Sequence, residues 1–74
     1  MNIEEIREKV GEAFLSSEII CIYFRDNTKK PRWCIVKSTD AYECLIKFDT
    51  LLDDGLFVTA SATISYNDIS KVSC

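Results

Sequence analysis

The sequence predicts a mainly β domain in which one N-terminal α-helix precedes a small five-stranded barrel. Apolar residues recur at helical spacing over residues 2–15, and five segments of β-type composition follow, separated by polar turns. The closing stretch SYNDISKVSC turns one strand sharply into the last. Five short strands with an apolar face each close economically into a barrel, which removes exposed edges. An open twisted α+β sheet is the alternative architecture.

The chain length indicates a single domain over residues 1–74, with the helix at about 2–15 and the barrel at about 18–73. A chain of 74 residues buries only about 60% of the surface that it exposes when unfolded. The hydrophobic fraction of 47% is typical of a globular protein rather than of a disordered one.

The predicted helix has both of its ends marked in the sequence. Asn2 is a good N-cap, with Glu5 three positions later, and Ser16 and Ser17 are expected to end the helix. An isolated helix of this length is marginal in water, so it must dock an apolar stripe on the rest of the domain. The stripe consists of Ile3, Ile6, Val10 and Phe14.

The predicted strands cover residues 18–26, 32–38, 42–49, 56–66 and 68–73. Both faces of the first strand are apolar, so we expect the barrel interior to cover one face and the helix to cover the other. The fourth strand alternates apolar and polar residues from Leu56 to Tyr66, which predicts one buried face. Gly55 marks the hairpin that precedes it.

The closing strand is expected to be essential to the core. Ile64, Ile69 and Val72 are predicted to point inward, and Tyr66 to pack near the corner with its hydroxyl bonded to a partner. Asp68 is predicted to stabilise the turn by accepting a backbone N–H.

The residue types argue against catalysis and against metal binding. The chain has no His, so the usual general base is missing. The four cysteines are too widely spaced for a zinc site, and three lie in apolar runs as expected of reduced core residues. No glycine-rich phosphate loop or EF-hand spacing is present. We therefore expect a protein that is not an enzyme, with no catalytic residues, no metal and no cofactor.

The location expected from the sequence is cytoplasmic, with no membrane partner. No apolar run approaches the roughly 18 residues that a membrane helix needs. The first ten residues, MNIEEIREKV, are too highly charged for a secretory signal.

Charge is distributed unevenly along the chain. Residues 25–37 carry five cations against one acid, whereas residues 40–54 carry five acids against one lysine. Cations close to aromatic rings suit an anionic ligand, because the charge contacts phosphate and the ring stacks on a base. The candidate ligand-binding residues are Tyr23, Arg25, Lys29, Lys30, Arg32 and Trp33.

Two functions remain open at this point. The preferred one is a non-enzymatic interaction module that binds protein, by self-association through its acidic and basic patches. The alternative is the binding of single-stranded RNA or a nucleotide through residues 25–37, which would also suit a phage or mobile-element inhibitor or ligand sponge. The net charge of −3 opposes general nucleic-acid binding.

The order of one helix and five strands, with the ending ISYNDISKV, resembles the Sm-like small β-barrel family. The resemblance implies a small barrel and a tendency to form rings. The RNA-binding residues of the family are not carried over, because the motifs differ. Residues 32–38 contain no Gly, no Asn follows Phe48 and Asp49, and SYND stands where the family has a Gly-containing pair.

Overall fold

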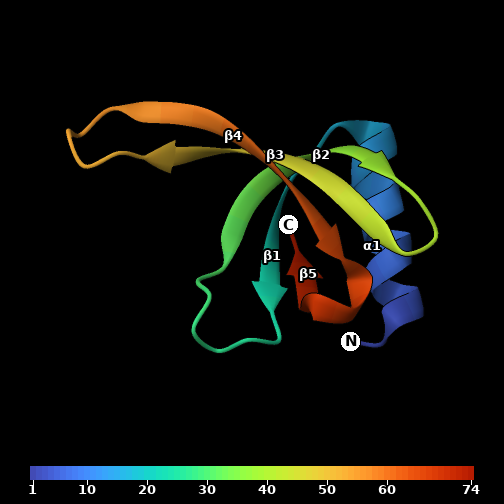
Figure 1. Cartoon of the computed structure of the whole chain (residues 1–74). Helices are drawn as coiled ribbons and strands as arrows, with labels where there is room; N and C mark the ends of the chain where they lie inside the picture. The colour runs from blue at the N-terminus through green and yellow to red at the C-terminus, as the bar shows by residue number, and fades with distance from the viewer.

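The fold is a twisted, five-stranded antiparallel sheet with one helix packed against it (Figure 1), as a computed structural model describes for all residues 1–74. The strands lie in the order β4-β3-β2-β1-β5. The predicted mainly β domain with an N-terminal helix is confirmed. In chain order the elements are α1 (Ile3–Ser16), β1 (Ile19–Phe24), β2 (Arg32–Thr39), β3 (Glu43–Leu51), β4 (Phe57–Ser65), the 3-10 helix η1 (Tyr66–Asp68) and β5 (Ile69–Ser73).

The sheet is not closed, so the predicted closed barrel is wrong and the open sheet of the alternative is observed. β4 and β5 are the two edges, and they do not pair with each other. β4 is bonded to β3 along its whole length, from the pair Glu43–Ser65 to the pair Leu51–Phe57. The outer half of β4 therefore follows β3 away from the body of the domain, whereas β5 returns to pair with β1.

The helix begins and ends where the sequence predicts. The Asn2 side-chain oxygen accepts a hydrogen bond from the Glu5 N–H at 2.8 Å. Ser17 takes the left-handed conformation, with φ 56°, and its N–H donates to the Ala13 carbonyl. Phe14 lies outside the buried stripe and is exposed, because Ala13 occupies the inward position at this end. The helix is too short and too polar to cross a lipid bilayer.

One hydrophobic core holds the domain together, and it uses a single face of every strand. Thirteen buried residues form one cluster, and the predicted core residues Ile64, Ile69 and Val72 are among them. The helix packs into this same core through Ile6, Val10 and Ala13. The prediction that the helix covers the other face of β1 is therefore wrong, and Ile19 on that face is 59% exposed.

The β3–β4 hairpin projects from the body of the domain (Figure 1). Gly55 forms its turn with φ 86°, and the Asp54 carboxylate accepts the Leu56 N–H at 3.0 Å. The buried face predicted for residues 56–66 is wrong for its first half, because nothing packs beneath the hairpin. The apolar side chains around the turn are consequently all exposed, namely Leu51, Leu52, Leu56, Phe57 and Val58.

The corner between β4 and β5 differs from the prediction in two hydrogen bonds. Tyr66 packs in the core and is 1% exposed, but its hydroxyl has no hydrogen-bond partner. The Asp68 carboxylate does not cap the turn; the Ser65 hydroxyl accepts the Asn67 N–H at 3.3 Å instead. Asp68 contributes its carbonyl, which accepts the Arg25 N–H at 2.9 Å. Burial raises the pKa of the Tyr66 phenol above its usual value.

The buried position of Ile69 predicts a large loss of stability on truncation. Ile69 is 0% exposed at the start of β5. Ile69→Ala should lower the free energy of unfolding by about 2–5 kcal/mol, since it leaves a cavity in the only core. Chemical denaturation followed by circular dichroism measures this. Leu15→Ala, at a site that is 84% exposed, is the matched control and should change stability by less than about 0.5 kcal/mol. Equal losses of stability in Ile69→Ala and Leu15→Ala would contradict the assignment of Ile69 to the core.

The Tyr66 hydroxyl has no hydrogen-bond partner, so Tyr66→Phe should not lower the free energy of unfolding as Ile69→Ala does. A buried hydroxyl without a hydrogen bond carries a desolvation cost of about 1–3 kcal/mol, which phenylalanine removes while keeping the ring. We expect the variant to be at least as stable as the wild type in thermal unfolding. A clear drop in Tm would show that the hydroxyl has a partner in solution.

Candidate functional site

A groove opens where the projecting hairpin leaves the body of the sheet. The ladder between β2 and β3 stops at the pair Ile35–Lys47, although β2 begins at Arg32 and β3 continues to Leu51. The two strands part beyond this pair, and a groove of about 340 Å³ lies between them. Its lining comes from four strands and consists of Ile19, Trp33, Cys34, Ile35, Lys37, Lys47, Phe48, Asp49 and Thr59.

Most of the lining lies on the face of the sheet opposite the core. Ile19 pairs with Ile35, and Ile35 pairs with Lys47, so these three residues form one row across the sheet. Trp33 lies two positions along β2 from Ile35 and therefore shares that face. Asp49 pairs with Thr59, whose hydroxyl donates to the Asp49 carboxylate at 3.1 Å.

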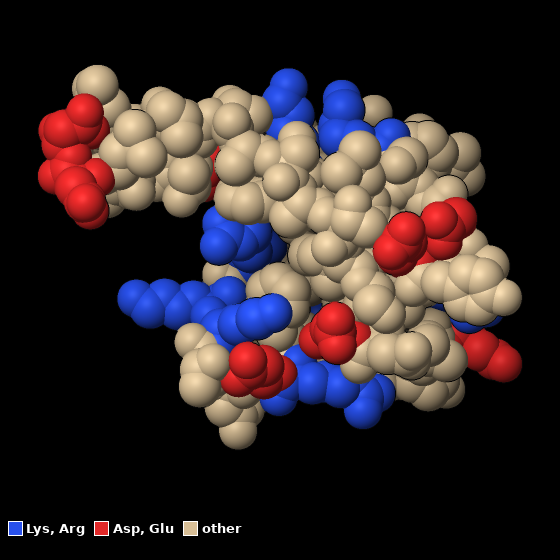
Figure 2. Space-filling view, in the orientation of Figure 1, with Lys and Arg blue, Asp and Glu red and all other residues tan.

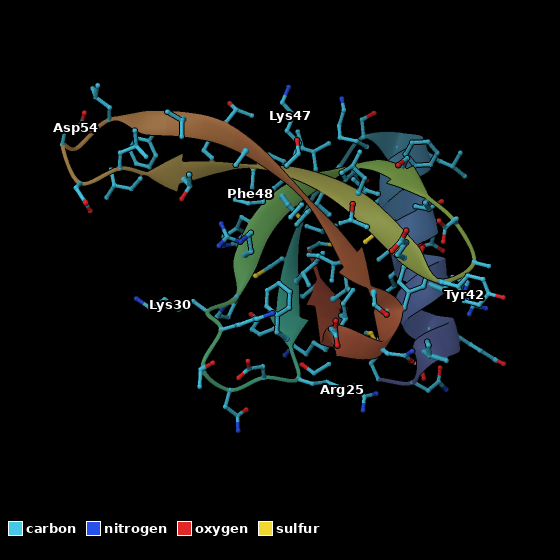
Figure 3. The ribbon with its side chains drawn as sticks, in the orientation of Figure 1. Arg25, Lys30, Tyr42, Lys47, Phe48 and Asp54 are labelled. Atoms are coloured by element: carbon cyan, nitrogen blue, oxygen red, sulfur yellow. The ribbon has the colours of Figure 1, made fainter.

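The groove combines exposed apolar surface with positive charge. Trp33 and Ile19 are each 59% exposed, and the lysines Lys37 and Lys47 are exposed beside them. Figure 3 shows Lys47 on one side of the base of the hairpin and Phe48 on the other. A groove lined by an exposed aromatic ring and two lysines is suited to a ligand that is both apolar and anionic.

Arg32 and Trp33, which are neighbours in the predicted site, point to opposite faces of β2 because side chains alternate along a strand. The Arg32 guanidinium carbon lies 4.0 Å from the centroid of the Phe48 ring. This cation–π contact holds Arg32 on the core side of the hairpin base, beneath the groove rather than in it.

The other predicted site residues are dispersed around the β1–β2 loop. The Arg25 side chain donates to the Ile69 carbonyl at 3.4 Å, which ties Arg25 to the start of β5. The Lys29 ammonium lies 5.6 Å from the Phe24 ring centroid, and Lys71 lies 4.6 Å from that of Tyr23. Lys30 is exposed and projects from the loop below the hairpin (Figure 3). The structure therefore places only Trp33, of the six candidates, in the groove.

Lys37, Lys47 and Phe48 were not among the predicted site residues, although all three line the groove. Sequence reasoning grouped cations by their proximity along the chain. The groove instead depends on which strands are neighbours and on where one ladder stops, and neither is visible in a run of residues. The only available signal was the alternation of residues 46–49, which places Lys47 and Asp49 on one face of the strand and Phe48 on the other.

The titratable groups near the core offer no activated nucleophile. Burial raises the pKa of the Cys34 thiol to about 11, and burial likewise raises that of Cys44 to about 11. Both side chains are therefore neutral thiols at physiological pH, and a neutral thiol is a poor nucleophile and a poor metal ligand. Cys21 is also buried and free, whereas Cys74 is free and exposed. No three cysteine, aspartate or glutamate side chains are arranged to hold a metal ion.

Comparisons with family models, curated proteins and solved structures give no match to this chain.

Proposed function

We propose that the chain is a non-enzymatic interaction module that self-associates, built on an Sm-like arrangement of one helix and five strands. The support for the Sm-like type is the element order and the short 3-10 turn that returns β5 to β1. The support for self-association is the projecting hairpin, and this is the observation on which the proposal depends.

The hairpin presents more apolar surface than a small soluble domain usually leaves in water. Leu51, Leu56 and Phe57 are 61%, 64% and 69% exposed, and they are neighbours around one turn. Burial of a leucine or phenylalanine side chain contributes about 1.5–3 kcal/mol. A second molecule that covers this turn would therefore gain several kcal/mol from side chains that contribute little to the isolated chain.

The open sheet supplies a second reason for association. β4 and β5 each have one row of backbone N–H and C=O groups without a strand neighbour. The two edges differ in sequence, so contact between the β4 edge of one copy and the β5 edge of another is head-to-tail. Contacts of this kind generate closed rings when the rotation between copies closes.

Removal of the apolar turn tests self-association directly. The double substitution Leu56→Ser with Phe57→Thr should shift the protein toward monomer and raise the dissociation constant by more than about tenfold. Light scattering coupled to size exclusion measures the mass over a range of concentrations. Circular dichroism should show an unchanged melting transition, because both side chains are exposed in the monomer.

The matched control removes the same two side-chain types from the end of the helix, where Phe14 and Leu15 are also exposed. Phe14→Ser with Leu15→Ser should leave the mass unchanged. A wild-type protein that stays monomeric at every concentration, at both low and high salt, would refute self-association. Equal effects of the two double substitutions would show that the hairpin has no special role.

A second candidate function is the binding of an anionic ligand such as single-stranded RNA or a nucleotide. The observation that favours it is the exposed Trp33 ring beside Lys37 and Lys47. Arg32 adds positive charge at the base of the hairpin, where it contacts Phe48, and Lys29 and Lys30 add charge in the adjoining β1–β2 loop. Figure 2 shows basic side chains below the projecting hairpin.

Trp33 is the only tryptophan, so its fluorescence reports on this second function. A single-stranded oligonucleotide or ATP should quench the emission at low salt, and the effect should weaken above about 0.15 M salt as screening increases. Lys37→Gln with Lys47→Gln should abolish the quenching if the groove holds the ligand. An unchanged emission with both ligands at low salt would exclude this candidate.

A further inference from the structure

The two ends of the β3–β4 hairpin carry complementary surfaces. The tip of the hairpin is acidic as well as apolar, because Asp53 and Asp54 lie among its exposed leucines. The groove at the base is apolar and basic. Figure 2 shows acidic side chains gathered at the far end of the hairpin and basic ones around its base.

We propose that the hairpin tip of one copy docks into the groove of another copy. This inference rests on the self-association proposed above and names the contact that produces it. Leu51, Leu52, Leu56 and Phe57 would supply the apolar surface against Trp33 and Ile19, and the two aspartates would lie opposite Lys37 and Lys47.

The tip cannot occupy the groove of its own chain. β3 and β4 remain paired from Phe48–Ala60 out to Leu51–Phe57, so the hairpin is an extended ladder that holds the turn away from its base. The Asp54 carboxylate and Gly55 keep the turn tight. An occupant of this chemistry must therefore come from a second molecule.

Two other acidic segments expose less apolar surface than the hairpin tip does. The helix exposes Phe14 and Leu15 near Glu12, and the β2–β3 turn exposes Tyr42 between Asp40 and Glu43, whereas the tip exposes four large apolar side chains around two aspartates. The β1–β2 loop is basic and would be repelled by the lysines of the groove. The groove contains one acid, Asp49, and its carboxylate accepts a hydrogen bond from Thr59 at 3.1 Å.

Each copy has one tip and one groove, so the contact is head-to-tail, and every copy can both donate a tip and accept one. The contact is also compatible with pairing of the sheet edges, because it uses the turn and the outer face rather than the backbone edges of β4 and β5. It predicts that assembly depends on opposite charges at two separate positions of the same chain.

Charge reversal with complementation tests the contact. Variant A carries Lys37→Glu and Lys47→Glu, which makes the groove acidic. Variant B carries Asp53→Lys and Asp54→Asn, which makes the tip basic while asparagine preserves the acceptor for the Leu56 N–H. Each variant alone should associate at least about tenfold more weakly than the wild type. An equimolar mixture of A and B should assemble, because each tip then meets a groove of opposite charge.

Sedimentation velocity at low salt measures these masses, and circular dichroism checks that each variant is folded. Lys29→Glu with Lys30→Glu is the control, since it makes the same charge change in the β1–β2 loop, and it should assemble like the wild type. Trp33 emission should shift to the blue when the wild type or the A and B mixture assembles, and it should not shift in A alone.

The outcomes separate this contact from self-association in general. A wild type that assembles while A and B also assemble alone would overturn the docked tip but leave self-association intact. A wild type that is always monomeric would overturn both proposals. Quenching of Trp33 by an oligonucleotide in the monomer, with no effect of tip substitutions, would assign the groove to nucleic acid and overturn the docked tip.

Discussion

The burial of one sheet face against one helix is the constraint on which the rest of the structure depends. A chain of this length has a single core, and its thirteen clustered residues come from that face, from the helix and, for Tyr66, from η1. No further helix or strand remains to cover the other face of the sheet. Most of the opposite face of the sheet, on which only Cys21 is buried, and the outer half of the hairpin therefore stay in water unless another molecule covers them.

Apart from Phe14 and Leu15 at the end of the helix and Tyr42 in the β2–β3 turn, this constraint explains where the exposed apolar residues gather. Ile19 and Trp33 lie on the uncovered face, and Leu56 and Phe57 lie on the hairpin beyond the reach of the helix. A leucine at the surface is ordinary, but a cluster at the end of a projecting element is not. The same shortage of core that limits the stability of the monomer thus leaves surface available for association.

The sequence predicted most of the local structure because local signals are strong in this chain. Asn2 and Ser17 bound the helix as expected, Gly55 marks the hairpin, and Ile64, Ile69 and Val72 of the closing stretch lie in the core as predicted. The boundaries of the fourth strand were also close to those observed. The predicted burial of this strand was wrong for its first half, because alternation shows which residues share a face and does not show whether anything covers that face.

Closure of the sheet and composition of the groove were not predictable from the same signals. Closure requires β4 to leave β3 and reach β5, but the ladder with β3 is continuous to Leu51–Phe57, and no sequence pattern gives that length. The candidate site assumed that cations adjacent in sequence act together. Alternation along β2 instead sends Arg32 toward Phe48 and Trp33 toward the opposite face, where lysines from β2 and β3 join it.

The uneven distribution of charge along the chain can be interpreted only when the length of the β3–β4 ladder and the lining of the groove are considered together. Acids and bases separated along the chain could have neutralised each other within one folded molecule. The paired strands of the hairpin prevent this, because they hold Asp53 and Asp54 at the turn, away from the groove that Lys37 and Lys47 line at its base (Figure 3). In the proposed contact, attraction between the two patches would act only between molecules, and burial of the apolar side chains around each patch would add a favourable free energy that salt does not screen.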